Sequence, residues 1–253
     1  MHYKSTGTAT CYTYHQMTLI ITTATTREME AVLKGFNGRG RVGCVLPRQG
    51  EVCASPVNER QCLLAVTGVG PVNAAFTLGR LLGEHRNIDG VISLGIAGTF
   101  DPDAAPLGST VLATRETWAD YGLYTAQGVD PMGIGFGQTD DAVNPVWNSI
   151  ELNPAPVLAV LQLTPPPLCR TGGSLTVAAA SGTAERACAM RQTHHALTEN
   201  MEGFALALGC LRQGVPFLEL RTVSNVVGSR AAHDWAVDDA FASLGQAARA
   251  LFV

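Results

Sequence analysis

Apolar strand-like segments alternate with stretches of helical periodicity from Met17 to the end of the chain. This alternation is typical of a sheet covered by helices on both faces, because the helices between strands pack back onto the sheet. One segment, residues 89–94, is apolar almost throughout, which predicts a strand whose two faces are both buried. The sequence therefore predicts an α/β fold with helices on both sides of a central sheet.

The same pattern predicts the order of the elements. Strands are expected at residues 18–23, 42–46, 51–54, 62–67, 89–94, 109–117, 174–180, 196–198 and 217–223. Helices are expected at residues 28–36, 71–82, 156–163, 184–193, 201–212 and 233–252. Residues 119–154 are rich in Gly, Asp, Asn and Pro and show no clear period, so we expect a long irregular loop that closes over a ligand or faces a partner.

Length and composition favour one compact domain. A chain of 253 residues suits a single α/β domain with a large core, and no repeat or linker divides it. We expect this domain to cover residues 17–253, after an N-terminal extension over residues 1–16 that lies outside the fold. With 46% hydrophobic and only 15% charged residues, the composition favours a compact enzyme or a homo-oligomer.

Charge, cysteine spacing and hydropathy argue against several kinds of partner. The net charge is -4 and no run of Lys or Arg is present, so we expect no nucleic acid partner. The seven cysteines are scattered without a Cys-x-x-Cys pair, which indicates reduced thiols in the cytoplasm rather than a zinc site or a disulfide framework. No apolar run reaches the roughly 18 to 20 residues of a membrane span, so we expect no membrane partner.

Residues 199–203, Glu-Asn-Met-Glu-Gly, place carboxylates and an amide in front of a helix that is apolar almost all round. Carboxylates beside a buried helix cost desolvation energy unless they are paired or bind a ligand. Two interpretations stay open at this point. The segment is either an ordinary helix start, with Asn200 as N-cap and acidic side chains favoured by the helix dipole, or part of a binding site.

Other polar or glycine-rich residues also follow predicted strands. These are residues 23–28, with Glu28 at the end of a hydroxyl-rich turn, residues 95–98 and residues 224–225. Ligands of open α/β sheets bind at the carboxyl ends of strands, which a parallel sheet brings to one edge. Each segment alone is explained equally well as a first helical turn, a packing turn or a cap. Their shared position at strand ends favours a common pocket.

Several familiar motifs are missing. The glycine turn is not Gly-x-Gly-x-x-Gly, and neither a Gly-x-x-x-x-Gly-Lys-Ser/Thr loop nor a Gly-x-Ser-x-Gly elbow is present. His194 and His195 are adjacent and cannot face one metal from a strand or a helix. We therefore expect no metal and no organic cofactor.

Four segments together resemble the nucleoside phosphorylase/nucleosidase superfamily. They are Thr-Gly-Val-Gly-Pro-Val-Asn-Ala-Ala at 67–75, Gly-Ile-Ala-Gly at 95–98, Glu-Asn-Met-Glu-Gly at 199–203 and Arg-Thr-Val-Ser-Asn at 221–225. The resemblance extends over residues 17–252. It implies a three-layer sandwich with a central mixed, mostly parallel sheet, cleavage of the N-glycosidic bond of a small purine nucleoside, and a homo-oligomer of unspecified size.

The resemblance also implies roles for individual residues. Met201 and Glu202 match the pair that holds the ribose hydroxyls, which suits a carboxylate acceptor beside a flexible thioether. Glu28 matches the carboxylate that orients and activates the attacking water, with Glu30 as the fallback. The residues expected to line the base and the rest of the pocket are Ile96, Ala97, Gly98, Asn200 and Ser224.

Water is favoured over phosphate as the attacking group. A phosphorylase has to hold an anion, usually with arginines and a hydroxyl near the glycine turn. Ser93 and Ile96 stand where related phosphorylases carry such residues, and Arg27 is the one remaining candidate. One arginine next to a carboxylate suits water better than an anion.

Asn225 stands where related nucleosidases that release adenine carry an Asp that protonates N7. An amide is no proton donor in that sense, but its N–H can stabilise the negative charge on a departing 6-oxopurine such as hypoxanthine. Asn225 can also be read as a plain turn residue. The alternatives are a nucleosidase or phosphorylase for methylthioadenosine, adenosylhomocysteine or inosine, and an inactive nucleoside-binding module.

The far end of the substrate is expected to meet Trp118, Phe136 and Arg230. A planar guanidinium suits a carboxylate, which makes Arg230 the candidate for an acidic substrate group. Aromatic residues near loops are also common packing anchors, and this second interpretation stays open for Trp118 and Phe136.

Overall fold

The computed structural model describes residues 17–36, 46–141 and 143–253. Its strands are β1 (Thr18–Thr23), β2 (Val52–Val57), β3 (Arg60–Val66), β4 (Gly90–Thr99), β5 (Thr110–Trp118), β6 (Leu123–Thr125), β7 (Gly128–Asp130), β8 (Ser149–Glu151), β9 (Arg170–Thr176), β10 (Thr198–Asn200) and β11 (Phe217–Val226). Its helices are α1 (Thr26–Gly35), α2 (Pro71–Glu84), α3 (Pro154–Val160), α4 (Ala184–His194), α5 (Gly203–Gln213), the short 3-10 turn η1 (Ala232–Asp234) and α6 (Val237–Leu251).

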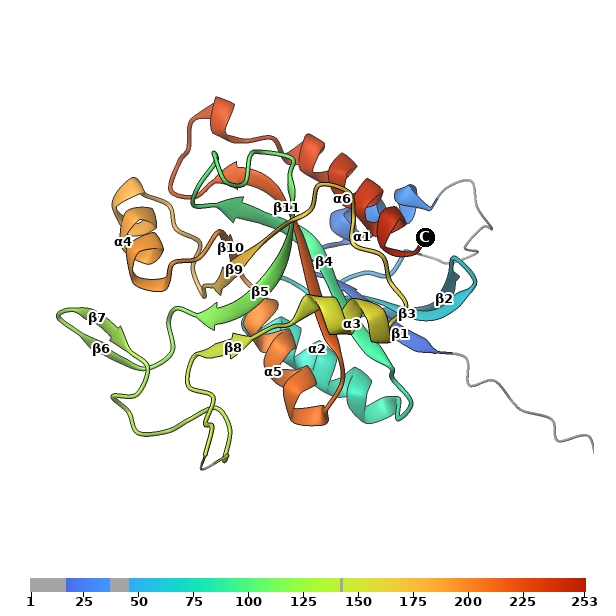
Figure 1. The fold of residues 1–253 in the computed structure, drawn as a ribbon, viewed down its shortest axis with the longest axis horizontal. Helices are drawn as coiled ribbons and strands as arrows, with labels where there is room; N and C mark the ends of the chain where they lie inside the picture. Colours follow the sequence, from blue (N-terminus) through green and yellow to red (C-terminus); the bar gives the residue numbers. More distant parts are fainter. Residues whose placement is uncertain (1–16, 37–45, 142) are drawn as a thin grey trace, which may run out of the picture.

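A nine-stranded sheet forms the centre of the molecule (Figure 1). Its order is β10-β9-β5-β11-β4-β1-β3-β2, with β8 beside β5, while β6 and β7 form a separate hairpin. β4 runs parallel to both β1 and β11, and β5 runs antiparallel to β11. The predicted α/β class and mixed sheet are thereby confirmed.

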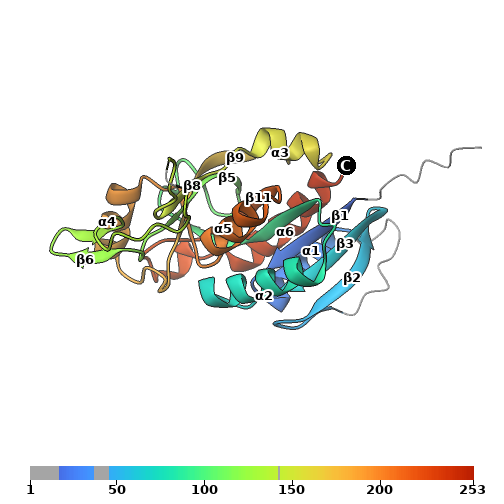
Figure 2. The same ribbon diagram turned by 90° about the horizontal axis from the view of Figure 1, so that it is seen from below.

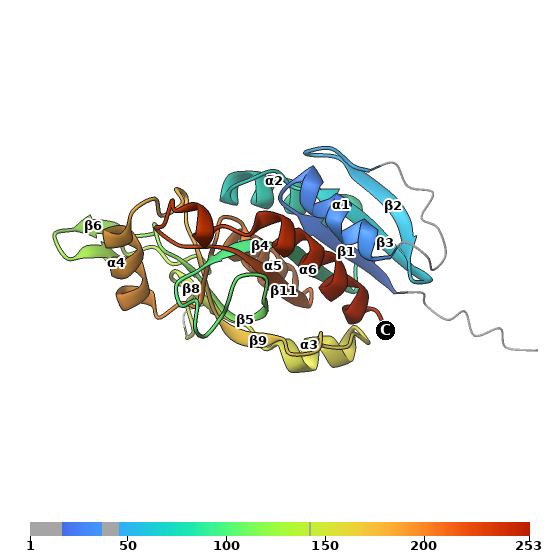
Figure 3. The ribbon, with the colours of Figure 1, turned by 90° about the horizontal axis from the view of Figure 1, so that it is seen from above.

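Helices cover both faces of the sheet because the strands are apolar on both faces. Leu19 and Ile21 of β1 belong to the core that contains Met29 of α1 and buried residues of α6. Ile20, between them in sequence, points to the opposite face and packs with Leu78 of α2 and Phe204 of α5. Figures 2 and 3, seen from below and from above, show α2 with α5 on one side and α1 with α6 on the other.

The short strand β10 closes part of the sheet into a ring. It pairs in parallel with β9 and antiparallel with β4, where Glu199 stands opposite Gly98. Since β4, β11, β5 and β9 are already joined edge to edge, β10 completes a ring of five strands. Residues 199–200 therefore reach the glycine segment of β4 from an antiparallel neighbour, and not from a parallel strand as the strand-end rule assumed.

The structure corrects several local predictions. Residues 95–98 lie inside β4, because β11 continues to pair with that stretch beyond residue 94, and they form no turn. Ser224 and Asn225 lie within β11, where the register with β4 shifts between Val223 and Asn225. The irregular region 119–154 contains the β6–β7 hairpin and β8. The extension at 1–16 and nearly all of the strand expected at 42–46 lie outside the described residues.

Two further predictions concern helices and thiols. In the ranges that the structure describes, no helix combines the length and the apolarity that crossing a bilayer demands. Four of the described cysteines, Cys62, Cys169, Cys188 and Cys210, are free.

Candidate active site

A pocket of about 400 Å³ lies between the end of β1, the second half of β4, the end of β11, and β10. The start of α6 completes its wall. Ten of the residues predicted from the sequence line it: Glu28, Ile96, Ala97, Gly98, Asn200, Met201, Glu202, Ser224, Asn225 and Arg230. Segments from distant parts of the chain thus meet in one cavity, as the strand-end argument predicted.

Glu28 is part of a capping box at the start of α1. Thr25 caps the helix by accepting a hydrogen bond from the Glu28 backbone N–H, and Glu28 Oε2 accepts from the Thr25 N–H at 2.8 Å. The other carboxylate oxygen, Oε1, accepts from the Ile96 backbone N–H at 3.0 Å. These contacts fix a side chain that is only 3% exposed at the pocket wall. Glu28 is therefore both a helix cap and a pocket residue.

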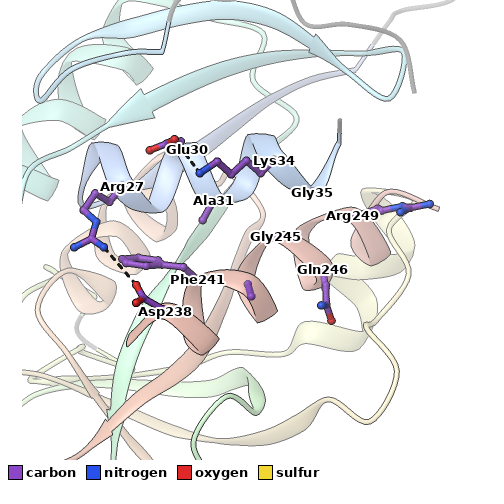
Figure 4. Close-up of a pocket in the computed structure, with 11 residues that line it drawn as sticks. Arg27, Glu30, Ala31, Lys34, Gly35, Asp238, Phe241, Gly245, Gln246 and Arg249 are labelled. Atoms are coloured by element: carbon purple, nitrogen blue, oxygen red, sulfur yellow. Dashed lines mark ion pairs between the residues drawn. The ribbon is translucent and has the colours of Figure 1, made fainter. Parts of the chain in front are cut away.

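Glu30, the fallback for Glu28, points elsewhere. It lies on the outer side of α1 and pairs with Lys34 at 2.9 Å (Figure 4). Its side chain lines a different cavity, the groove between α1 and α6. The geometry leaves Glu28 as the carboxylate of this turn that faces the pocket.

Glu202 is the second buried carboxylate of the pocket. Its Oε1 accepts from the backbone N–H of Gly70, which caps α2, at 3.0 Å. Its Oε2 lies 3.7 Å from Nη1 of Arg221, close enough for charge attraction but not for a hydrogen bond. Burial raises the pKa of Glu202 above its ordinary value, and the charge of Arg221 opposes that rise.

Arg221 is the main residue that sequence reasoning left without a role. It is 2% exposed, its Nε donates to Glu219 Oε1 at 2.9 Å, and its Nη2 donates to Ser93 Oγ at 3.3 Å. A Cβ atom on Gly95 would collide with Arg221 Nη1 and with Glu28 Oε1, so glycine is required where these two groups meet. The signal that could have identified it is the pair of opposite charges Glu219 and Arg221, which the two-residue spacing places on the same face of a strand.

Asn225 lies at the register shift of β11. Ser224 donates its hydroxyl to Asn225 Oδ1 at 2.9 Å, and Asn225 Nδ2 donates to the Val226 carbonyl at 3.3 Å. A Cβ atom on Gly98 would stand 3.1 Å from Nδ2 and collide with Val227. The absence of a side chain on Gly98 therefore leaves room for the Asn225 amide at the pocket wall.

Asn200 borders the pocket, but its side chain is committed to the protein. Its Oδ1 accepts from the backbone N–H groups of Glu202 and Gly203 at 2.8 and 2.7 Å, which caps the first turn of α5. The N-cap of α5 is Glu202 and not Asn200, although the Asn200 amide satisfies two N–H groups at the start of the helix. Glu199 is likewise held inside the protein, by the backbone N–H and hydroxyl of Ser181 at 2.8 and 2.6 Å.

Two predicted pocket residues lie elsewhere. The ring of Trp118 stacks on Tyr121 at 5.3 Å between centroids and contacts Phe204, so it anchors packing. Phe136 is 72% exposed in the irregular region and does not line the pocket. Neither residue is among those that line the pocket, so both predictions are corrected for this chain. Arg230 does reach the wall, where its guanidinium lies 5.6 Å over the ring of Trp235.

Other lining residues were not singled out from the sequence. Ser181 directly follows the strand expected at 174–180, so the strand-end rule would have selected it had it been applied there. Val69 and Phe241 also line the pocket but carry no local signal beyond their apolarity. Across the described residues, no group of three or more His, Cys, Asp or Glu is arranged to hold a metal ion.

Comparisons with known proteins agree with the motifs. A family model described as "Phosphorylase superfamily" matches residues 18–253. Futalosine hydrolase of Streptomyces coelicolor is 38% identical over 91% of this chain and 93% of its own length, and futalosine hydrolase of Thermus thermophilus is 33% identical over 73% and 78%. The crystal structure of 5'-methylthioadenosine/S-adenosylhomocysteine nucleosidase from Helicobacter pylori has a TM-score of 0.71 at 18% identity, covering 93% of this chain and 96% of that one.

Proposed function

The chain belongs to the phosphorylase superfamily, and from that premise we propose that it hydrolyses the N-glycosidic bond of futalosine, releasing hypoxanthine and dehypoxanthinylfutalosine. The two futalosine hydrolases above match most of this chain and most of their own length. The sequence motifs resemble the same enzyme, which acts in the menaquinone pathway. The match to the nucleosidase structure supports the fold alone.

The observation that carries the proposal is the meeting of two pocket residues, Glu28 and Glu202, with the guanidinium of Arg221, which is buried behind the pocket wall. Two carboxylates flank a single guanidinium there, and that guanidinium is already bound to Glu219. The local charge is therefore unfavourable for a phosphate ion and suitable for a neutral water molecule. Arg27, the other candidate for phosphate, is paired with Asp238 and lies over the ring of Phe241.

In this mechanism Glu28 aligns a water molecule against C1′ of the ribose and accepts its proton. Glu202 and Met201 hold the ribose hydroxyls and the apolar face of the sugar. The two carboxylates also stabilise the positive charge that the sugar gains as the glycosidic bond breaks. Backbone N–H groups set the positions of both carboxylates, so little reorganisation of these two side chains accompanies the reaction.

Asn225 is proposed to recognise the base. Its amide N–H can donate to an acceptor of a 6-oxopurine and so stabilise the charge on departing hypoxanthine. The Ser224 hydroxyl donates to Asn225 Oδ1, which supports this orientation of the amide because the oxygen is already engaged. A 6-aminopurine would instead require an acid that protonates the base.

The direct test is incubation of the purified protein with futalosine, with and without phosphate, followed by chromatography of base and sugar products. We expect hypoxanthine to be released at the same rate in both conditions, with a free sugar hydroxyl at C1′. Release that depends on phosphate and yields a sugar 1-phosphate would identify a phosphorylase. Futalosine recovered unchanged would favour an inactive nucleoside-binding module.

A second candidate activity is hydrolysis of another purine nucleoside, such as aminofutalosine, inosine, methylthioadenosine or adenosylhomocysteine. Asn225 argues against the 6-aminopurines among these for the reason given above. Inosine carries the same base as futalosine but lacks its acidic tail, so Arg230 at the pocket wall would have no partner. The ratio of kcat/KM for futalosine to that for inosine distinguishes these candidates.

We further propose that the protein acts as a homo-oligomer in the cytoplasm. On α2, next to the pocket residue Val69, the side chains of Val72 and Phe76 are 79% and 74% exposed. Apolar side chains gathered at one place are typical of a surface that another chain covers. Light scattering on the full chain, compared with the Phe76→Glu variant, would measure the assembly directly.

A further inference from the structure

The ring of five strands encloses a set of buried polar side chains that the mechanism does not use. Glu219 of β11 stands opposite Ser93 of β4, and Glu116 of β5 stands opposite Ser174 of β9. Asn200 of β10 completes the set. All five residues are at most 5% exposed, so every strand of the ring contributes buried polar groups to its interior.

Glu116 and Glu219 meet inside this ring, beneath the first turn of α5. Both are completely buried. A Cβ atom on Gly203 would collide with Glu116 Oε1 and with Glu219 Oε2, so these two oxygens lie next to the same point. Two carboxyl groups that share a buried site repel each other unless one of them carries a proton.

The remaining contacts of the two carboxyl groups all come from donors. Glu116 accepts from Thr176 Oγ1 at 2.7 Å and from Asn200 Nδ2 at 2.6 Å. Glu219 Oε1 accepts from Arg221 Nε at 2.9 Å and from Asn200 Nδ2 at 3.3 Å. Among the described residues, Glu219 Oε2 has no donor of its own. That oxygen is the one beside Glu116, which locates the proton between the two side chains.

Burial of both groups leads to the same conclusion. Burial, followed by the negative charge of Glu219, holds the pKa of Glu116 well above its ordinary value. The charged group next to the pair is Arg221, with Glu202 and Glu28 beyond it. β4, β9, β10 and α5 face the pair only with the neutral groups Ser93, Ser174, Thr176, Asn200 and Gly203 in the described part of the chain.

We propose that Glu116 and Glu219 are a proton-sharing pair of positioning residues that hold Arg221 at a fixed distance from Glu202. The pair carries one negative charge, which anchors Arg221 Nε at 2.9 Å and leaves Nη1 3.7 Å from Glu202 Oε2. Glu202 therefore keeps an oxygen free for the ribose hydroxyls. Without that charge, Arg221 closes on Glu202 and competes with the sugar. This inference rests on the proposed ribose-binding role of Glu202.

The first experiment reads the shared proton in the resting enzyme without any substrate. Infrared spectra of the full chain in heavy water at neutral pH are compared for the wild type and the Glu116→Gln variant. We expect a protonated-carboxyl band in the wild type that Glu116→Gln lacks. Absence of the band from the wild type, or its persistence in the variant, overturns the proposal whether or not the protein cleaves futalosine.

The second experiment reads positioning through kinetics with futalosine. Glu219→Gln moves the negative charge of the pair to Glu116, away from Arg221 Nε, so we expect KM to rise about tenfold while kcat changes less than threefold, in keeping with the loss of one charge-assisted contact. Glu116→Gln keeps the negative charge on Glu219 next to Arg221, so we expect a smaller rise in KM than in Glu219→Gln. If both variants show the same fall in kcat and the same rise in KM, the role of the pair is merely structural and the proposal is overturned.

Urea unfolding as a function of pH provides a readout that serves even if Glu219→Gln does not fold. A carboxyl group whose pKa is raised on folding stabilises the protein fully below its unfolded pKa, near 4.5, and this contribution is lost as pH rises through the folded pKa. The wild type is therefore expected to lose stability relative to Glu116→Gln as pH increases. Parallel curves for the two proteins would contradict the shared proton.

Discussion

Two cavities share a wall formed by Arg27 and Phe241. The charged side chains of one cavity are exposed, whereas the carboxylates of the other are buried. The groove between α1 and α6 is the larger, at about 560 Å³, against about 400 Å³ for the pocket at the strand ends. In the groove, Arg27 pairs with Asp238 at 3.6 Å and Lys34 pairs with Glu30 at 2.9 Å, all on an exposed surface (Figure 4). In the pocket, Glu28 and Glu202 are buried at 3% and 5% exposure.

Buried charge, rather than volume, distinguishes the candidate site from the groove. Surface ion pairs such as those of the groove satisfy each other and water, and they contribute little energy. A buried carboxylate costs several kcal/mol unless its surroundings compensate, on the order of the desolvation penalty of an ion. The backbone N–H groups of Ile96 and Gly70 and the guanidinium of Arg221 compensate for part of that cost. A ligand that binds to Glu28 and Glu202 explains why these two buried carboxylates are present despite the remaining cost.

The largest expected effect follows from replacing the carboxylate that belongs to the pocket. Glu28→Gln should lower kcat by about 10³-fold, as expected for loss of a general base, while nucleoside binding measured by calorimetry changes little. Glu30→Gln is the matched control, because it makes the same chemical change two residues later on the same helix but faces the groove. Its kcat should equal that of the wild type. Full activity of Glu28→Gln, or a loss in Glu30→Gln, would break the distinction between the cavities.

A smaller effect is expected for the residue proposed to recognise the base. Asn225→Asp should shift the ratio of kcat/KM for 6-aminopurine over 6-oxopurine nucleosides by about 10- to 100-fold, the equivalent of one hydrogen bond involving a charged group. The shift arises because an acid can protonate the leaving adenine whereas a carboxylate repels an anionic hypoxanthine. Asn225→Ala is the control and should weaken activity on both kinds of base. An unchanged ratio in Asn225→Asp would remove the base-reading role.

The two arginines near the shared wall provide a third test. Arg230 lies on the pocket side, so Arg230→Ala should raise KM for futalosine about tenfold, the value of one carboxylate contact, and leave KM for inosine unchanged. Arg27 is already engaged with Asp238 and Phe241, so Arg27→Ala should change neither value. Steady-state kinetics with both nucleosides measures this. A larger effect of Arg27→Ala would extend the substrate site into the groove.

The fold could be predicted because it depends on local patterns. Periodicity identified the buried strands and the helices between them, and the motifs identified most of the pocket. What periodicity does not contain is pairing between distant strands. The closure of β10 on β4 placed residues 199–200 opposite the glycine segment, and continued pairing with β11 made residues 95–98 part of a strand. Both results depend on the register of partners far away in sequence.

The same limit explains which site residues were missed or misplaced. Glu116, Glu219 and Arg221 look like ordinary charged residues of two separate strands, and their function appears only when the ring brings them together. Asn200 lines the pocket as expected, but its amide is engaged by Glu116 and by the backbone N–H of Glu202. Phe136 was expected in the pocket on the strength of residue type alone, in a region without periodicity. Without periodicity, the local sequence does not indicate where the Phe136 side chain points.

The smallest expected effect on catalysis tests whether the groove is simply where two helices pack. A Cβ atom on Gly35 of α1 would collide with the backbone carbonyl of Gly245 on α6, so Gly35→Ala should lower the free energy of unfolding by about 1–3 kcal/mol, as overpacking does. On α2, a Cβ on Gly83 would meet no atom within 4 Å, so Gly83→Ala should be neutral or stabilising. Urea unfolding measures both.

At a temperature where both variants are folded, kcat/KM should be unchanged, because α1 holds Glu28 from its first turn and Gly35 lies at its opposite end. A fall in kcat/KM of Gly35→Ala without loss of stability would show that the groove contributes to the reaction.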